Sequence, residues 1–290
     1  MNNTSRRFPL ANEGLSSAFI APTKKLSSFA FGYILRDTRS LNLSAAERMN
    51  RFPASPLCTV TWIFDGEIYL ANSDYPMPLI SFSGPQTKPV VSSNPGAIKA
   101  LSLAIYPDAW TRLTGSPMTD FIDRTLDLED VIGSALFETF RQMSCDELLN
   151  DKILNFEERM SEEWRQVRPQ NRVFTQNLQD WFYSLLRQAT MSGSGKSLRQ
   201  TQRRLKRLSG QTQRDIMTYV RLENLFSSWA LAKGKPKANL SDLAFGNDFS
   251  DQSHMGREVK RLVGVSPAQF NQLIDSDESY WFYRLMGERY

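Results

Sequence analysis

The sequence predicts an α+β protein of two domains, the first rich in strands and the second helical. Apolar residues alternate with turn signals through the first hundred residues, and helical spacing dominates after Tyr106. The excess positive charge lies in the last third of the chain. With 290 residues, 41% of them hydrophobic, the chain is long enough for two domains and can bury a core in each.

The strand prediction rests on period-two patterns and on turn residues. Phe29, Phe31, Tyr33 and Leu35 share one face of an extended segment. Residues 58–64 alternate in the same way and lead into Asp65-Gly66, a pair that predicts a tight hairpin to a strand at 68–70. Further short strands are expected at 78–84, 89–91 and 97–106. Short strands at this spacing predict a barrel or a sandwich.

Helical spacing begins at residue 107. A short helix is expected to end at Gly115, and further helices are expected over 128–143 and 146–160. A longer amphipathic helix is predicted from about 171 to 188. We expect the apolar stripes of these helices to pack in the core and between the domains.

Charge is distributed unevenly along the chain. Residues 1–150 carry 13 Lys and Arg against 15 Asp and Glu, whereas residues 191–290 carry 16 against 10. A basic domain attached to a mildly acidic one is typical of proteins that bind a polyanion, although solvated helical surfaces are also often basic.

Histidine and cysteine usage narrows the function classes. A lone His254 excludes a Ser-His-Asp arrangement and a site of several histidines, unless another copy of the chain contributes. Cys58 and Cys145 stand far apart, which favours free thiols in a reducing cytoplasm. No stretch approaches the roughly 20 apolar residues of a membrane helix, and the first residues do not resemble a signal peptide. We therefore expect a cytoplasmic protein that is no enzyme and needs no metal or cofactor.

The segment SGSGKS at 192–197 offers a rival interpretation, that of a nucleotide-binding protein or enzyme. A phosphate-binding P-loop needs a glycine five positions before its Gly-Lys pair, and it follows a buried strand. Thr190 occupies that position, and the preceding segment has helical spacing. We therefore interpret SGSGKS as a turn.

A capped basic helix follows that turn. Ser197 and Gln200 form a capping box, Leu198, Leu205 and Leu208 are expected to face inward, and Gly210 ends the helix. Arginine and glutamine hydrogen-bond the major-groove edges of guanine and adenine in pairs, whereas lysine mainly contacts phosphates. An exposed stripe of donors is expected on the opposite face, and a solvated basic surface is the alternative; the stripe is Arg199, Gln202, Arg203 and Lys206.

A second helix of similar design lies about fifty residues downstream. Ser250 or Asp251 caps it, Gly264 ends it, and a short positioning helix at 239–249 precedes it. A long helix over 214–232 links the two units. The inward face is expected to hold Met255, Val259, Leu262 and Val263, and the outward face Ser253, Gly256, Arg257 and Lys260, flanked by Gln252 and His254.

Residues 249–270 resemble the second helix-turn-helix signature of the AraC/XylS transcription regulators. Residues 197–210 and the long helix after them, with Arg221 and Glu223, are similar to the first unit, so the resemblance covers about 175–272. Two departures are Asp248, where the family usually has glycine, and the SGSGKS turn. The resemblance is carried by Phe249, Asp251-Gln252-Ser253, Met255, Arg257, Lys260-Arg261, Gly264, Ser266-Pro267 and Phe270.

The resemblance implies a bacterial regulator whose two recognition helices enter successive major-groove segments, about 34 Å apart. Lys206 and Lys260 would contact the DNA phosphates. Recruitment of RNA polymerase by an activator is implied by the family resemblance alone. Carried over by position, the base-reading candidates are Arg199, Gln202 and Arg203 in the first helix and Gln252, Ser253, His254 and Arg257 in the second.

The first half also resembles a family feature. Its strands, followed by residues 106–133, look like the cupin-like sensor domains that precede this DNA-binding domain in many such regulators. The region has no histidine, so a receptor for a small-molecule effector, or a dimerisation barrel, fits better than a metal enzyme. Tyr33, Trp62 and Tyr69 are candidate pocket residues, although core packing is the favoured interpretation for all three.

The expected fold is thus an N-terminal cupin-like β-barrel with trailing helices and a C-terminal all-α double helix-turn-helix. We expect the sensor or dimerisation domain at 1–110, a helical extension and linker at 111–172, and the DNA-binding domain with its tail at 173–290. The sequence assigns no role to residues 273–290 and does not separate an activator from a repressor.

Overall fold

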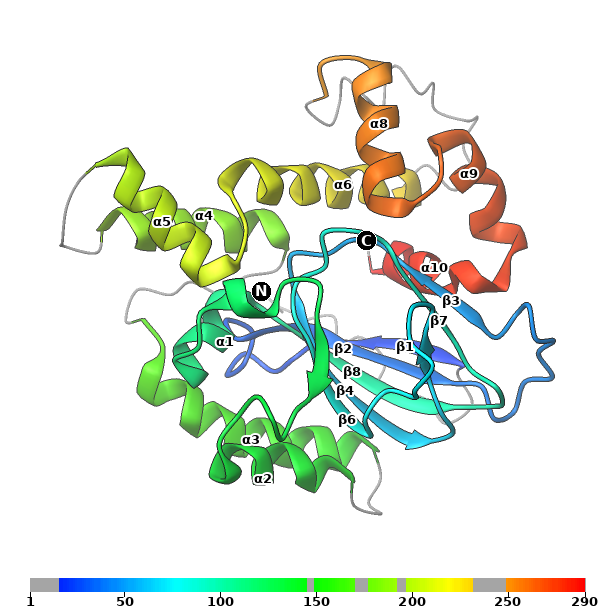
Figure 1. Ribbon diagram of the computed structural model, residues 1–290, viewed down its shortest axis with the longest axis horizontal. Coiled ribbons are helices and arrows are strands. Elements are labelled where there is room, and N and C mark those ends of the chain that lie inside the picture. The colour runs from blue at the N-terminus through cyan, green and yellow to red at the C-terminus, as the bar shows by residue number, and fades with distance from the viewer. Residues whose placement is uncertain (1–15, 145–148, 170–176, 192–196, 232–248, 290) are drawn as a thin grey trace, which may run out of the picture.

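The computed structural model describes residues 16–144, 149–169, 177–191, 197–231 and 249–289. Strands fill the first half of the chain and helices the second, which confirms the α+β class (Figure 1). Among the described helices, none combines the length and the apolar character that a membrane crossing requires. The strands are β1 Ser17–Ile20, β2 Ala30–Asp37, β3 Met49–Phe52, β4 Cys58–Asp65, β5 Tyr69–Leu70, β6 Ile80–Ser83, β7 Val90–Ser93, β8 Lys99–Ile105 and β9 Thr125–Asp127.

The described strands form two antiparallel sheets. One has six strands in the order β1-β2-β8-β4-β6-β9, and the other has three in the order β3-β7-β5. Residues of both sheets line one cavity, so the sheets face each other across it. The edge strand β9 lies within residues 111–172, the segment expected to be a helical extension. It pairs with β6 and therefore belongs to the larger sheet.

The hairpin predicted at Asp65-Gly66 is wrong in its pairing. Gly66 does adopt a positive φ of 78°, as a tight turn requires. However, β5 pairs with β7 in the smaller sheet. Both edges of β4 are already paired, one with β6 and the other with β8, so the chain after the turn has no free edge to return to.

The helices cover the six-stranded sheet and then build the C-terminal part. In Figure 1, α2 and α3 lie beneath the larger sheet, while α4, α5, α6, α8 and α9 lie on its other side. The bounds are α1 Pro107–Thr114, η1 Met118–Phe121, α2 Ser134–Arg141, η2 Gln142–Ser144, α3 Leu149–Val167, α4 Leu178–Met191, α5 Leu198–Ser209, α6 Gln213–Leu231, α8 Gln252–Val263, α9 Pro267–Ser276, η3 Glu278–Tyr280 and α10 Trp281–Glu288.

The six-stranded sheet has two chemically different faces. Trp62 points toward the helices, where its ring lies 6.0 Å from that of Phe140 in α2 and 5.7 Å from that of Phe156 in α3. Its indole N–H donates to the carbonyl of Phe140 at 2.8 Å. The next residue back along β4, Thr61, lines the cavity instead, because successive side chains of a strand point to opposite faces.

The three aromatic residues considered as pocket candidates lie away from the cavity. Tyr33 is fully buried and Trp62 is 1% exposed, so both are core residues, as the favoured interpretation had it. Tyr69 is half-buried. The described residues that line the cavity include none of the three.

Gly66 allows a direct test of this turn. A Cβ at Gly66 would lie 2.3 Å from the carbonyl oxygen of Ala97, in addition to the cost of a positive φ. We expect Gly66→Ala to lower the free energy of unfolding by about 2 kcal/mol in a urea titration. Gly96→Ala is the matched control, since a Cβ there meets nothing within 4 Å. Equal stability of the two variants would contradict the strained-turn assignment.

Candidate nucleic-acid interface

Helix α5 begins and ends at the residues that the sequence predicts, and of the two hydrogen bonds of the expected capping box the described residues show the one that Ser197 accepts. Ser197 is its N-cap and accepts a hydrogen bond from the backbone N–H of Gln200 at 3.3 Å. Gly210 ends the helix with a φ of 76°, and its N–H donates to the carbonyl of Lys206 at 2.7 Å. These caps fix where the exposed stripe of α5 begins and ends.

The expected donor stripe of α5 is fully on the surface. Arg199, Gln202, Arg203 and Lys206 are all exposed. Among the described side chains of α5, no acidic one is present to neutralise them. The stripe can therefore offer both paired donors and positive charge to a polyanion.

One inward residue of α5 was predicted wrongly. Leu205 is 1% exposed, as expected, but Leu198 is 73% exposed. The C-terminal part of α5 contacts η1 and α1, where a Cβ at Gly210 would lie 2.5 Å from Ile122. Leu198 lies in the first turn, about 18 Å of helix length from Gly210 at 1.5 Å per residue, so it does not share that packing.

Helix α8 has the same design with a stronger cap. Asp251 is the N-cap, and its carboxylate accepts from the backbone N–H of His254 at 2.6 Å. That hydrogen bond lowers the pKa of Asp251 below its usual value. Gly264 ends the helix with a φ of 93°. Of the two caps left open by the sequence, the structure selects Asp251.

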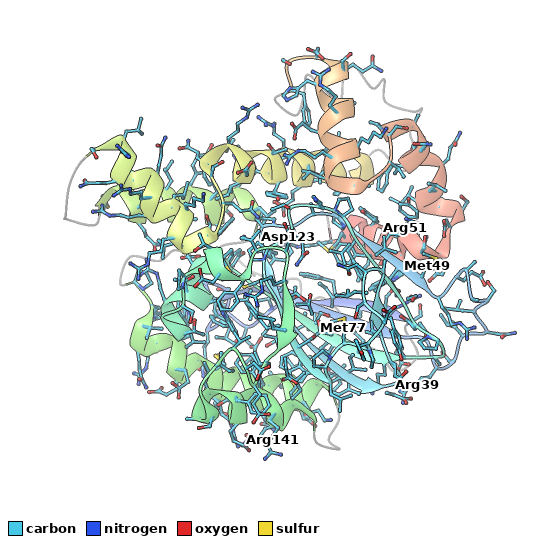
Figure 2. The ribbon with its side chains drawn as sticks, in the orientation of Figure 1. Arg39, Met49, Arg51, Met77, Asp123 and Arg141 are labelled. Atoms are coloured by element: carbon cyan, nitrogen blue, oxygen red, sulfur yellow. The ribbon has the colours of Figure 1, made fainter. Side chains whose placement is uncertain are left out.

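The two faces of α8 lie as the sequence predicts. The inward face is buried throughout, with Met255, Val259 and Leu262 fully buried and Val263 at 4% exposure. The outward residues Gln252, Ser253, Arg257 and Lys260 are exposed, while Gly256 is half-buried. Figure 2 shows side chains projecting outward from both α5 and α8.

His254 is less available than its neighbours on α8. Its side chain is 27% exposed and lies beside Glu258, with Nε2 and a carboxylate oxygen 4.0 Å apart. Its Nδ1 lies 3.2 Å from the Ser250 hydroxyl, and its ring packs edge-on against Phe249. Local packing at the helix start thus holds the imidazole, and a base contact by His254 stays a prediction.

Helix α6 separates the two candidate recognition helices. Figure 1 shows α5 at one end of α6 and α8 at the other, on the side of the molecule away from α2 and α3. Ile216, Tyr219 and Val220 of α6 are buried, as predicted. The positioning helix expected at 239–249 lies outside the described residues except for Phe249, and so does Asp248.

Residues from the first half of the chain touch the last turns of both candidate recognition helices. The backbone N–H of Ala54 donates to the carbonyl of Leu262 in α8 at 2.8 Å. The Thr111 hydroxyl approaches the carbonyl of Leu208 in α5 at 3.5 Å. Pro89 lies against Gly264, with its ring 3.5 Å from where a Cβ would be. These contacts leave the outward faces uncovered.

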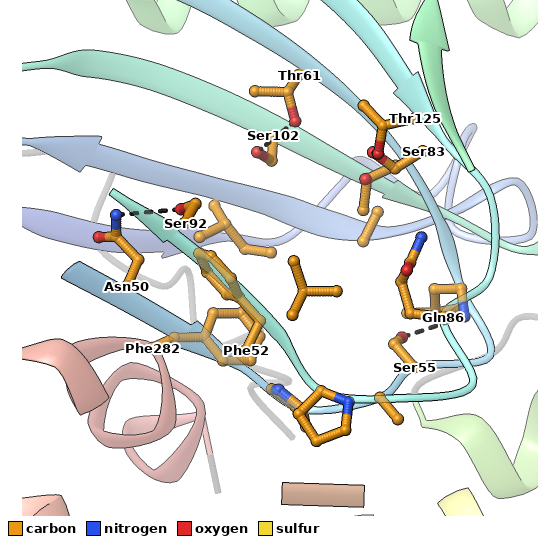
Figure 3. A pocket seen from close by; sticks show the side chains of 18 of the residues that line it. Asn50, Phe52, Ser55, Thr61, Ser83, Gln86, Ser92, Ser102, Thr125 and Phe282 are labelled. Carbon is orange, nitrogen blue, oxygen red and sulfur yellow. Dashed lines mark hydrogen bonds between the residues drawn. The ribbon is translucent and has the colours of Figure 1, made fainter. Parts of the chain in front are cut away.

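A second feature was missed by the sequence analysis, namely a cavity of about 950 Å³ between the two sheets, α6 and α10 (Figure 3). Its lining includes Arg36, Thr61, Tyr219 and Trp281, which are spread over most of the chain. The aromatic run at 280–283, between polar neighbours in the unassigned tail, was the signal that α10 is buried rather than a loose terminus.

Comparison with known proteins supports the prediction of a helix-turn-helix domain in the second half of the chain. The sequence matches the family model of a helix-turn-helix domain over residues 192–272. No curated protein matches the chain. The solved structures that resemble the chain include ToxT from Vibrio cholerae in several forms. At the TM-scores found, the backbones superpose too loosely to transfer a ligand or a mechanism to this chain.

Three of these ToxT crystal structures span most of both chains. An apo form is 14% identical, with a TM-score of 0.39, and the match covers 84% of this chain and 96% of that one. A form bound to (E)-4-(8-methylnaphthalen-1-yl)but-3-enoic acid is 11% identical, with 78% and 98% covered and a TM-score of 0.36. A form bound to an unsaturated fatty acid is 10% identical, with 82% and 94% covered and a TM-score of 0.34.

The rival nucleotide site can be tested directly. Residues 192–196 of SGSGKS lie outside the described residues, but α4, which precedes them, is a helix through Met191 and not the buried strand of a P-loop. We expect ATP with magnesium to leave the melting temperature of the full chain unchanged in a thermal-shift assay. A rise that depends on ATP and is lost in Lys196→Ala would reinstate the nucleotide-binding interpretation.

Proposed function

We propose that the chain is a DNA-binding transcription regulator of the AraC type, whose helix-turn-helix domain is the one matched at residues 192–272, and that α5 and α8 read successive major-groove segments of one duplex. The observation that carries the proposal is the pair of capped helices, each buried on one face and exposed on the other. Helix α6 holds them apart at its two ends. A helix fits the major groove, and its exposed side chains reach the base edges.

The exposed residues divide into two proposed roles. Arg199, Gln202 and Arg203 of α5 and Gln252, Ser253 and Arg257 of α8 carry the side-chain types that hydrogen-bond base edges. Lys206 and Lys260 lie one turn further along their helices and are proposed to contact phosphates, because an ammonium group acts as a point charge without base selectivity. His254 is a weaker candidate, since neighbouring side chains already engage it.

We further propose that the N-terminal domain modulates DNA binding through the contacts at Ala54 and Pro89. Ala54, Gln86 and Pro89 all line the cavity. Ala54 and Pro89 also contact the end of α8, and the carbonyl of Gln86 accepts a hydrogen bond from Tyr219 of α6 at 3.2 Å. A small molecule in the cavity would press on the same loops that position α8. In Figure 1 the axes of α5 and α8 run in different directions, so their relative orientation is a variable that such a ligand can change.

The remaining assignments follow from this function. The domain division at 1–110, 111–172 and 173–290 is retained as a proposal, with β9 of the middle segment completing the sheet of the first. A regulator that binds chromosomal DNA in a bacterium works in the cytoplasm. Contact with RNA polymerase and self-association stay predictions of the family resemblance.

Arg257 tests base reading. Its side chain is exposed on α8, where a guanidinium can bond a guanine edge bidentately. We expect Arg257→Ala to weaken binding to the specific duplex by about 1–3 kcal/mol and to relax the sequence preference, as measured by fluorescence anisotropy. The matched control is Arg261→Ala on the same helix, whose side chain is engaged by Glu258 at 2.9 Å. Equal losses on specific and random duplex would show that Arg257 contacts phosphate only.

Lys206 tests the backbone contacts of α5. Lys206→Ala should lower affinity for specific and random duplex alike, since one released counterion is lost whatever the sequence. The slope of log affinity against log salt concentration should become shallower by about 1. A loss confined to the specific site, with an unchanged slope, would assign Lys206 to base reading instead.

A further inference from the structure

The start of α8 is held by two reciprocal hydrogen bonds, and His254 takes part in both. The Asp251 carboxylate accepts from the backbone N–H of His254 at 2.6 Å. In return, Nδ1 of His254 accepts from the backbone N–H of Ser250 at 3.3 Å. Side chains that accept backbone N–H groups at this point stabilise a helix start and fix where the chain enters it.

Helix α9 shows the ordinary form of this arrangement. Its N-cap Ser266 accepts from the backbone N–H of Gln269 at 3.3 Å, and the Gln269 side chain accepts from the backbone N–H of Ser266 at 3.1 Å. Glutamine or glutamate is the usual third helical residue of such a capping box. In α8 the imidazole of His254 stands at that third position and reaches one residue further back, to Ser250. His254 is thus a capping residue.

The partner of Nδ1 fixes the proton on the imidazole ring. A backbone N–H can only donate, so Nδ1 has to be the unprotonated nitrogen that accepts. In a neutral imidazole the proton then lies on Nε2. That nitrogen lies 4.0 Å from a carboxylate oxygen of Glu258, one turn further along α8. Both ring nitrogens of His254 therefore lie next to groups of the helix and its cap.

Packing holds the imidazole ring as well. Phe249 is 5% exposed, and the imidazole lies edge-on to it with 5.7 Å between the ring centroids. The Arg221 guanidinium of α6 lies over the same Phe249 ring, 5.7 Å from its centroid. His254 thereby joins the first turn of α8 to the long helix between the two units. The two residues before it, Gln252 and Ser253, are exposed.

We infer that His254 is a positioning residue of α8, whose neutral imidazole holds the first turn in the orientation that presents Gln252 and Ser253 to DNA, and that it does not itself read a base. The cap rests on the hydrogen bonds alone, while the role of the two presented residues rests on the proposed function. Both lie between Asp251 and His254, so a change in the cap moves them together. Sequence preference then depends on a side chain that contacts no base.

Substitution separates positioning from base reading, because the two roles use different ring nitrogens. Asparagine places its Oδ1 at about the position of Nδ1 and keeps the acceptor for Ser250, but it has no atom at the position of Nε2. We expect His254→Ala to weaken specific DNA binding about fivefold, as the loss of one cap does, and His254→Asn to restore most of it. Fluorescence anisotropy measures this on a duplex that the full-length protein selects from a random pool, and on a scrambled duplex. Equal losses in the two variants would assign Nε2 to a base and overturn the positioning role.

A double-mutant cycle with Gln252→Ala measures whether His254 acts through its neighbour. If the cap presents Gln252, the double variant should lose less affinity than the sum of the two single losses. Additive losses would show that each residue contacts DNA on its own.

Ser266→Ala is the matched control, since it removes the capping box of α9, a helix with no proposed base contact. It should lower the melting temperature of the full chain and leave the ratio of specific to scrambled affinity unchanged. A fall in that ratio as large as the one in His254→Ala would make the effect one of general stability and overturn the positioning role.

The single histidine of the chain allows a test without DNA. In full-length protein labelled with nitrogen isotope at histidine and purified without a histidine tag, the one imidazole gives its own pair of nuclear magnetic resonance signals. We expect the proton on Nε2 in neutral buffer. A proton on Nδ1, in the other tautomer or in the imidazolium, would overturn the cap and leave the proposed function standing. The expected ring signals without any sequence-specific DNA binding would overturn the proposed function and leave the cap standing.

Discussion

The alternation of side chains along β4 and β8 is the constraint on which the rest of the structure depends. One face of these strands carries Trp62 and its apolar neighbours, and α2 and α3 seal it. The other face carries the hydroxyls of Thr61 and Ser102, which bond each other and leave a space that the smaller sheet and α10 enclose. Because a strand presents both faces at once, closing the core on one side creates the cavity wall on the other.

Residues around the cavity also connect the two domains. The loops at 53–57 and 84–89 bound it and also touch the end of α8 and Tyr219 within α6. The segment 277–289 fills the remaining gap with aromatic rings. Several of the contacts that bound the cavity are thus also contacts between the two halves of the chain. Under the proposed function, a ligand in the cavity would reach the helices proposed to read DNA through these contacts.

Much of the DNA-binding half was predictable, because its determinants are local. Caps, helix-ending glycines and helical spacing act within a few residues, so Ser197, Asp251 and Gly264 do what the sequence indicates. Leu198 shows the limit. Its spacing predicts an inward side chain, but whether anything covers a first turn depends on the neighbouring helices. The hairpin after β4 failed for a similar reason, since its pairing depended on strands far away in the chain.

The sequence by itself determined the α+β class, the two capped basic helices and the residues that face outward on them, since periods of two and 3.6 residues and cap chemistry are short-range properties. Only the tertiary structure decided the cavity and the place of the tail. Arg36 and Asn50 stand more than two hundred residues from their partners Glu278 and Trp281 and share no motif with them. Their meeting depends on how the last helix returns to the first strands, which is set by packing over the whole molecule.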